Sequence, residues 1–297
     1  MPIHERLNIE YWKQVCPLQL LRERTRRLPA LGGITGPCDI AALEHLRDAS
    51  YGNLPGLERV PTDVFIWSRG EPEQRLVTKI GGLPYREARK PWPTAPSGIP
   101  LTFVAQMCFA DSRDLTPVIP GDVLLIFTEA KNWGTEEDPL YDFMGEAEDD
   151  SYLLFEWVSF HNFPLITQQE IPKTSLEIMP CYATIYRTWD YPQVDEFAYP
   201  DLAENIPGVI EATKIGGICP WSEAPWSDYT EDETSEYLCS LRSIDHEMSW
   251  PFPFLNMPDD NDWLDWGPGG PLIIGDVGFI NLFLQRDGTI RWRFHTP

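Results

Sequence analysis

The sequence predicts an α+β protein, mainly antiparallel, in which two sequence-related units follow a set of N-terminal helices. Three observations support this class. A passage at residues 78–85 returns at residues 213–221, which indicates an internal duplication. Short apolar runs bounded by proline and glycine, typical of strands, fill the chain after residue 62. Few long helical patterns separate these runs, which argues against a doubly wound parallel sheet.

The duplication extends beyond the repeated passage. Each copy begins with Thr-Lys-Ile-Gly-Gly, continues to an apolar run, and then reaches a Gly-Asp-Val that opens a further apolar run. The three blocks occupy residues 78–82, 103–107 and 121–123 in the first copy, and 213–217, 237–241 and 275–277 in the second. Because the blocks keep the same order, chance similarity is a poor explanation.

The first sixty residues have a helical pattern. Apolar residues three or four positions apart predict one buried stripe over residues 4–27, which Pro17 kinks or divides. A second helix is expected from near Pro37 to Arg47, with proline in its first turn. The stripe of the first helix consists of Leu7, Tyr11, Val15, Leu18 and Leu21.

The rest of the chain is predicted to be strands and loops. An Asp-Gly pair at 287–288 indicates a hairpin between the last two strands. Strands are predicted at 64–67, 75–80, 101–109, 122–127, 152–160, 182–188, 237–241, 277–285 and 289–294. The proposed division is an N-terminal helical segment at 1–60, a first repeat unit at 61–135, an acidic connecting region with strands at 136–205, and a second repeat unit at 206–297. Whether the two units share one core stays open at this point, as does the oligomeric state.

The charge of the chain is unevenly distributed. The net charge is −23, yet residues 1–135 carry 16 basic and 15 acidic side chains. Residues 136–285 carry 4 basic and 30 acidic side chains. A field of this sign repels phosphate and anionic lipid, so nucleic acid and membrane surfaces are disfavoured as partners, whereas a basic protein is attracted. The alternative is that the acidity only maintains solubility.

The cysteines and the hydropathy point to a cytoplasmic protein. No run approaches the 18 apolar residues of a membrane span, and the N-terminus has no apolar signal core. None of the six cysteines forms a Cys-x-x-Cys pair, so free thiols are expected, without disulfides or a zinc site. We predict no metal and no cofactor.

The repeated blocks resemble the YwqG-like family, a bacterial family of unknown function. The resemblance lies in Lys-Ile-Gly-Gly-Leu-Pro, Trp-Pro, an apolar run ending in Ala-Gln, and Pro-Gly-Asp-Val, at residues 79–84, 92–93, 98–106 and 120–123. It is strong over residues 75–130 and weak over 206–285, where Ser240 stands in place of Gln106. The resemblance implies a duplicated α+β fold and a bacterial cytoplasmic setting, with some relatives encoded near toxin and immunity genes.

Common catalytic motifs are absent from the sequence. There is no phosphate-binding Gly-x-x-x-x-Gly-Lys-Ser/Thr, no Gly-x-Ser-x-Gly and no His-Glu-x-x-His. The repeated glycines are predicted to be turns of the duplicated fold, namely Gly81, Gly82, Gly121, Gly216, Gly217 and Gly275. Asp122 and Asp276 are expected to cap the loops that contain them. Alternatively, these two aspartates face one cleft as an acid and base.

Tryptophan and aspartate gather in the second copy. The tryptophans concerned are Trp221, Trp226, Trp250, Trp263 and Trp266, and the aspartates beside them are Asp259, Asp260, Asp262 and Asp265. Aromatic anchors inside a charged rim are typical of protein-binding sites. The tryptophans could instead form the core of a loop-rich unit. The aspartates lack the glycine and distal glutamate of a calcium-binding loop.

These features favour a non-catalytic interaction protein that binds a basic protein partner, with toxin neutralisation by an immunity protein as the specific case. Two alternatives stay open. One is a hydrolase-type enzyme with carboxylates in the cleft between the repeats. The other is a module that binds a small ligand or carbohydrate by stacking on tryptophan.

Overall fold

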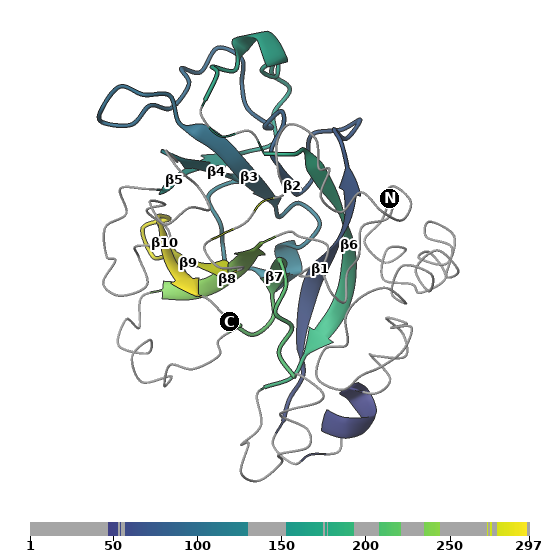
Figure 1. Ribbon diagram of the computed structural model, residues 1–297. Helices are drawn as coiled ribbons and strands as arrows, with labels where there is room; N and C mark the ends of the chain where they lie inside the picture. The colour runs from purple at the N-terminus through teal and green to yellow at the C-terminus, as the bar shows by residue number, and fades with distance from the viewer. Residues whose placement is uncertain are drawn as a thin grey trace.

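A computed structural model gives the fold and describes residues 47–52, 54, 57–129, 153–174, 176, 178–192, 208–220, 235–243, 272, 274 and 278–295. These residues form a single ten-stranded antiparallel sheet, shown in Figure 1. Its strands are β1 (Val60–Arg69), β2 (Lys79–Ile80), β3 (Thr102–Cys108), β4 (Val123–Thr128), β5 (Leu153–Val158), β6 (Cys181–Asp190), β7 (Lys214–Gly216), β8 (Ser235–Arg242), β9 (Phe279–Gln285) and β10 (Ile290–His295).

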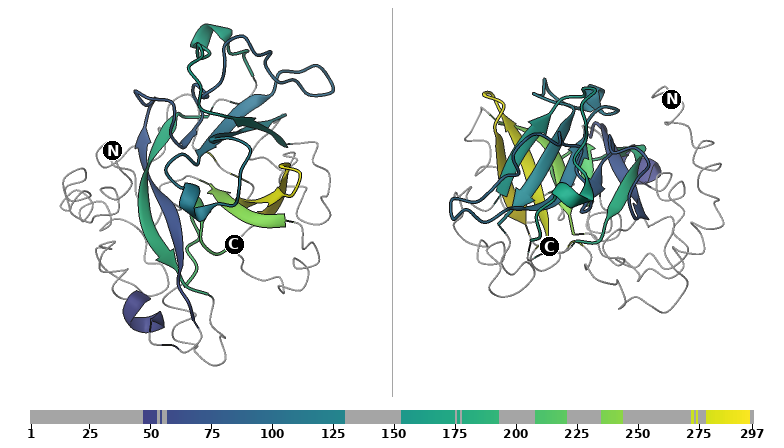
Figure 2. Two further views of the ribbon diagram at one scale, coloured as in Figure 1. Left: turned by 180° about the vertical axis from the view of Figure 1, so that it is seen from behind. Right: turned by 90° about the horizontal axis from the view of Figure 1, so that it is seen from above.

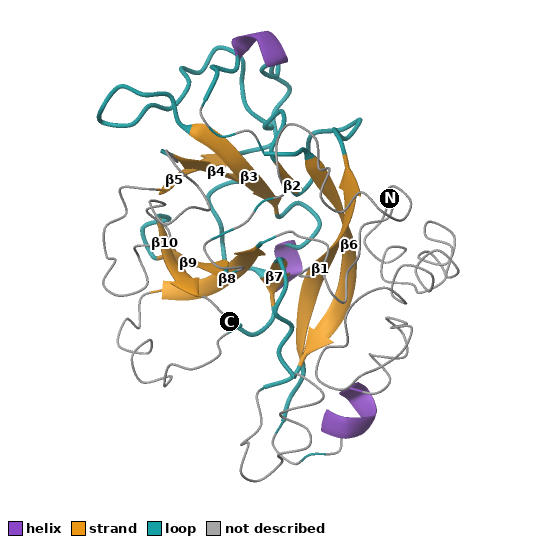
Figure 3. Ribbon diagram, in the orientation of Figure 1, coloured by secondary structure: helices purple, strands orange, loops and turns teal. Residues whose placement is uncertain are grey.

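The predicted fold class is wrong in its helical part. Within the described ranges, helix is confined to residues 47–51 and to two 3-10 turns, η1 (Arg113–Leu115) and η3 (Gln168–Glu170), as Figure 3 shows. The protein is therefore mainly antiparallel β rather than α+β. Of the two helices expected near the N-terminus, 4–27 and 37–47, all but Arg47 lie outside the described residues. Within the described part of the chain, the helix between consecutive strands consists of these two 3-10 turns alone.

The order of the strands is symmetric. It runs β10-β9-β8-β7-β1-β6-β2-β3-β4-β5, and it reads the same from either edge when β1–β5 are exchanged with β6–β10. The two sequence-related segments therefore occupy equivalent places in the sheet. The first strand of each half is exchanged, because β1 pairs with β7 of the second half and β6 pairs with β2 of the first. The long β1–β6 pair lies between the halves.

The sheet curls until its two edges approach each other, so that it resembles a nearly closed barrel (Figure 2). The indole Nε1 of Trp157, on edge strand β5, donates a 3.1 Å hydrogen bond to the carbonyl of Gly288 in the β9–β10 hairpin. One hydrophobic cluster fills the interior and draws side chains from both halves, including Phe65, Met107, Ile215 and Leu282. The two halves therefore share one core.

A second, smaller cluster covers the outer face of β3 and β4. Buried Arg86 holds the loop above it, donating to the carbonyls of Lys90 and Pro91 at 2.8 and 2.6 Å and to the Glu156 carboxylate at 3.1 Å. Both faces of β3 and β4 are thus covered, which accounts for their nearly continuous apolar sequence. Among the helical segments that are described, none is long and apolar enough to cross a bilayer.

Candidate functional site

The repeated Thr-Lys-Ile-Gly-Gly passage folds in the same way in both copies. The lysine lies on a very short strand, Lys79 on β2 and Lys214 on β7, and two glycines follow. All four glycines have positive φ, at 58° and 65° in the first copy and 67° and 74° in the second. Only glycine adopts this conformation readily, so the backbone reverses sharply two residues after each lysine.

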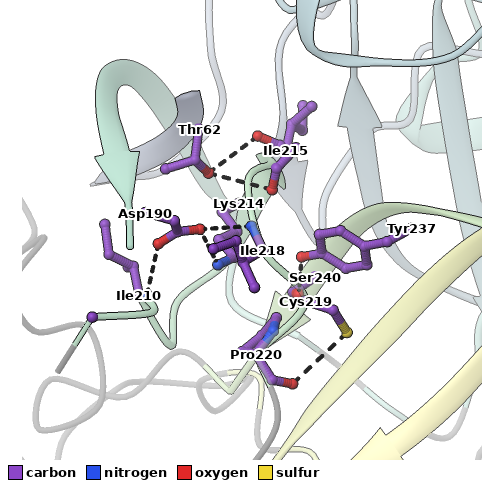
Figure 4. Close-up of polar contacts among 12 residues, drawn as sticks. Thr62, Asp190, Ile210, Lys214, Ile215, Ile218, Cys219, Pro220, Tyr237 and Ser240 are labelled. Carbon is purple, nitrogen blue, oxygen red and sulfur yellow. Dashed lines mark hydrogen bonds and ion pairs between the residues drawn. The ribbon is translucent and has the colours of Figure 1, made fainter. Parts of the chain in front are cut away.

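In the second copy the lysine binds a buried carboxylate. The Lys214 Nζ donates a 2.6 Å hydrogen bond to Asp190 Oδ2. The same oxygen accepts the Ile218 amide at 3.0 Å, and Oδ1 accepts the Ile210 amide at 2.7 Å. Figure 4 shows these contacts, with Asp190 reaching over from the end of β6. Both charged side chains are fully buried.

In the first copy a glutamate takes the equivalent place. The Lys79 Nζ binds the Glu71 carboxylate and also donates to the carbonyl of Leu83 at 2.9 Å. The Leu83 amide donates to Glu71 Oε1 at 2.8 Å, as the Ile218 amide does to Asp190. Each copy therefore forms a lysine–carboxylate cradle, by which we mean the lysine, the Gly-Gly turn, the amide after it and the bound carboxylate.

The second glycine of each pair is required by the carboxylate. A Cβ built on Gly82 would overlap Glu71 Oε1, and one built on Gly217 would overlap Asp190 Oδ2. The carboxylate therefore lies against bare backbone, within reach of both the ammonium and the amide. The repeated Gly-Gly serves the cradle as well as the turn.

Burial and charge oppose each other in both cradles. Burial lowers the pKa of Lys79 because it disfavours the ammonium, while the hydrogen bond and charge of Glu71 act to raise it. Burial likewise lowers the pKa of Lys214 against the opposing effect of Asp190. A buried ammonium needs a counter-ion, so each cradle is chemically a receptor for a carboxylate.

The neighbouring strand supports each cradle differently. Gln106 lies opposite Lys79 in the register, and its Oε1 accepts the Tyr85 amide at 2.7 Å. Its Nε2 donates to the carbonyls of Arg75 and Val77, at 2.6 and 2.7 Å. The single glutamine thus fixes both segments that flank the first cradle.

Two residues share this task in the second copy. Ser240 lies opposite Lys214 and donates to Asn281 Oδ1 at 2.7 Å, while Asn281 Nδ2 donates to the Pro220 carbonyl at 3.0 Å. Tyr237 also contacts Ser240, at 2.5 Å between their oxygens, and burial raises the pKa of its hydroxyl well above the usual value. The substitution of glutamine by serine is therefore compensated from β9.

The thiols near the second cradle are unreactive. Burial raises the pKa of Cys219 to about 12, although Lys214 acts to lower it, and burial also raises the pKa of Cys239. A thiol with so high a pKa is not a nucleophile at neutral pH. Cys108 and Cys181, the other described cysteines, are buried as well.

The predicted site residues are only partly covered by the described residues. Asp122 binds the side chain of Arg113 and accepts the Phe160 amide at 2.6 Å. Gly121 packs against the backbone of Val158 in β5. The remaining predicted catalytic, turn and binding residues lie outside the described part of the chain: Asp276, Gly275, Trp221, Trp226, Trp250, Trp263, Trp266, Asp259, Asp260, Asp262 and Asp265.

The sequence interpretation missed the cradles. Their signal was available, because both copies place a lysine two residues before Gly-Gly, next to a buried isoleucine. A repeated buried cation demands a repeated anion. Its partners, Glu71 and Asp190, precede the lysines by 8 and 24 residues, so spacing alone could not identify them.

Comparison with known families gives one match. The family described as a domain of unknown function, DUF1963, matches residues 78–296, which include both Gly-Gly turns and nine of the ten strands in full. The match begins at Thr78, the first residue of the repeated passage, and extends through β10. No curated protein matches the chain.

Proposed function

Because this chain belongs to the DUF1963 family, a family of unknown function, we propose a role from its own charges and contacts. The role is that of a non-catalytic interaction protein that binds a basic protein partner. The observation that carries the proposal is the separation of an electrically balanced β scaffold from strongly acidic segments.

The described scaffold has no net charge. Its residues include 16 basic and 16 acidic side chains, whereas the remaining residues include 7 basic and 30 acidic ones. Many scaffold charges are also paired with each other, as in Arg187 with Asp63, Lys214 with Asp190, and Arg86 with Glu156. The scaffold therefore contributes little to the field that a partner would meet.

The negative charge is concentrated in four internal segments. Residues 130–152, 193–207, 221–234 and 244–271 together include 23 acidic side chains and one basic side chain. Each segment is continuous in sequence with strands of the scaffold, so all four are tied to the same sheet. Such a charge excess speeds encounter with a basic surface at low salt.

Tryptophans accompany the charge. Trp221 and Trp226 fall in the third segment, and Trp250, Trp263 and Trp266 fall in the fourth. Desolvated aromatic side chains provide much of the affinity at protein interfaces, while charge mainly sets the rate of association and the specificity. We therefore assign the binding energy to the third and fourth segments.

The contacts of the described carboxylates favour a structural use over a catalytic one. Asp122, the first of the two candidate catalytic aspartates, is bound by Arg113 and by a backbone amide. Asp63 accepts Arg187 and Ser112, and Asp190 accepts Lys214 and two amides. Hydrogen-bonded, ion-paired carboxylates of this kind hold strands together and make poor general bases.

The finer proposal places the protein in the bacterial cytoplasm as a YwqG-like protein, with a basic toxin as the partner that it neutralises. It is supported by the sequence resemblance at residues 79–84, 92–93, 98–106 and 120–123. A basic toxin fits the field of the acidic segments, and neutralisation needs binding without chemistry.

The experiment compares three forms of the full-length protein as bait for basic proteins from native lysate. The first is the wild type. The second carries Asp259→Asn, Asp260→Asn, Asp262→Asn and Asp265→Asn. The third carries four neutralising substitutions in the first acidic segment, at Glu146, Glu148, Asp149 and Asp150.

We expect one basic protein to bind the wild type with an association rate that falls steeply as salt rises. The 259–265 variant should lose at least tenfold in association rate, and the 146–150 variant should lose less. If both variants lost association rate equally, the partner would be responding to the total negative charge of the protein and not to a site at residues 259–265. Tight binding with an association rate that does not change with salt concentration would refute the proposal.

A further inference from the structure

We propose that the first lysine–carboxylate cradle is an exchangeable carboxylate-binding site, which Glu71 occupies in this structure and which a small external carboxylate can take over. The inference concerns Lys79, Gly82 and Leu83, and it stands apart from the acidic segments. It rests on two observations: the cradle is a built anion receptor, and its present occupant is held more loosely than its counterpart in the second copy.

The receptor is built from rigid parts. Lys79 lies in the register between β3 and β6, and its side chain is fully buried. Its ammonium is fixed by the Leu83 carbonyl at 2.9 Å, so it does not depend on Glu71 for its position. The Leu83 amide points to the same place, because the Gly81–Gly82 turn directs it there.

The two donors suit the shape of a carboxylate. One oxygen of Glu71 binds Lys79 Nζ and the other binds the Leu83 amide, so the group bridges an ammonium and an N–H. The missing Cβ at Gly82 gives the space for the bridge. Any carboxylate with a small substituent can accept hydrogen bonds from the same two donors. When such a carboxylate replaces that of Glu71, the buried ammonium of Lys79 still has one negative counter-ion.

The occupants of the two cradles differ in how firmly they are held. Asp190 is fully buried at the end of β6, and it accepts Lys214 and the amides of Ile210 and Ile218. Glu71 has 36% of its side chain exposed, and the residues from 71 to 78 form no strand or helix. Within the described chain, its carboxylate has the donors Lys79 and Leu83 alone.

This asymmetry separates a fixed structural anion from a removable one. Asp190 cannot leave without exposing several buried donors, which is costly. Glu71 can swing into solvent as the donors pass to the incoming carboxylate, so the exchange has no comparable cost. The first cradle is therefore the site where a ligand carboxylate would bind, with the Glu71 side chain serving as an internal competitor.

The test is rescue of a vacated site by acetate. Glu71→Ala removes the competitor and leaves Lys79 without its counter-ion, so the variant should melt below the wild type in chloride buffer. Acetate should then raise its melting temperature by about 3 °C when present at tenfold its dissociation constant, relative to chloride of equal ionic strength. The wild type should respond less, because Glu71 competes.

Matched controls make the result specific. Glu73→Ala removes an exposed carboxylate two residues away and should show no acetate effect beyond that of chloride. Adding Lys79→Met to Glu71→Ala should abolish the rescue. If the alanine variant fails to fold, Glu71→Gln takes its place in the test, because glutamine keeps the size of the side chain. Acetate should raise the melting temperature of the Glu71→Gln variant as well.

Two outcomes would overturn the proposal. One is an acetate response of the Glu71 variants no larger than that of Glu73→Ala. The other is rescue that survives the loss of Lys79, since the anion would then bind elsewhere. Neither outcome bears on the binding of a basic partner by the acidic segments, so the two proposals can fail independently.

Discussion

Asp63 and Arg187 face each other across the β1–β6 pair, and the Arg187 guanidinium binds both carboxylate oxygens of Asp63. Its Nη2 lies 2.9 Å from Asp63 Oδ2, which also accepts the Ser112 hydroxyl at 2.6 Å. The outer edge of the same guanidinium binds Asp114 of η1, at 2.7 and 3.0 Å. One arginine thus ties the first strands of both halves to the η1 loop.

Asp63→Asn should destabilise the fold strongly, because it replaces the buried carboxylate that binds Arg187 with a neutral amide. Breaking a buried ion pair costs about 3–5 kcal/mol. The matched control is Asp114→Asn, which weakens the same arginine at an exposed carboxylate and should cost about 1 kcal/mol or less. Urea unfolding followed by tryptophan fluorescence measures both values. Similar costs for the two variants would show that burial does not govern this pair.

Lys214→Met should also cost about 3–5 kcal/mol, since it removes the nearer cation from the buried Asp190 and leaves only Arg47, at 3.9 Å. Adding Asp190→Asn should recover part of the loss, with a coupling energy of about 1 kcal/mol or more. The exposed Lys173→Met is the control and should change the free energy of unfolding by less than about 0.5 kcal/mol. Additive effects of the two cradle substitutions would contradict the pairing.

Gly217→Ala should be more harmful than Gly98→Ala. Both glycines have positive φ, at 74° and 83°, so both alanines carry backbone strain of about 1–2 kcal/mol. A Cβ at Gly98 meets nothing within 4 Å, whereas one at Gly217 would also displace Asp190. We expect a cost at least twice as large at Gly217, measured by thermal and chemical unfolding. Equal costs would mean that the cradle does not depend on the absence of the Cβ.

Asp122 should give a pH-dependent contribution to stability. Burial acts to raise the pKa of its carboxyl, but the Phe160 amide and Arg113 outweigh it, so the folded-state pKa is lowered. A lowered pKa stabilises the fold above the unfolded value of about 3.9, and this contribution is lost as pH falls through the folded value. The melting temperature of Asp122→Asn should therefore be below that of the wild type at pH 7, and the gap should close below about pH 4. A gap independent of pH would refute this origin.

The strands were predictable because their signal is local. Apolar runs bounded by proline and glycine located β3, β4 and β9 to within two residues. β2 is only two residues long where a six-residue strand was expected, because the segment before Lys79 is occupied by the contacts of Gln106 with the carbonyls of Arg75 and Val77. β7 was not predicted at all, since it is three residues long and its last residue is already the first glycine of the Gly-Gly pair, which leaves too short a pattern.

The cradles and the strand exchange could not be read from local patterns. The Lys214–Asp190 contact spans 24 residues, and the pairing of β1 with β6 joins residues more than 100 positions apart. The duplication alone indicated the cradles, because it placed the two lysines in equivalent positions of the sequence. The α+β prediction failed for a related reason: it gave weight to N-terminal periodicity, while the strand connections themselves contain no helix longer than a single 3-10 turn among the described residues.

The exchanged first strands have a consequence for synthesis on the ribosome. β1 emerges early, yet its nearest partner residue in β6, Cys181 opposite Arg69, is made 112 residues later. At about 5–20 residues per second, β1 waits on the order of ten seconds with its backbone groups unpaired. Neither half can finish before the other, so the nascent chain is open to aggregation until the last strands leave the exit tunnel. Translation speed and chaperone access should therefore govern the yield of this protein more than the stability of its finished fold.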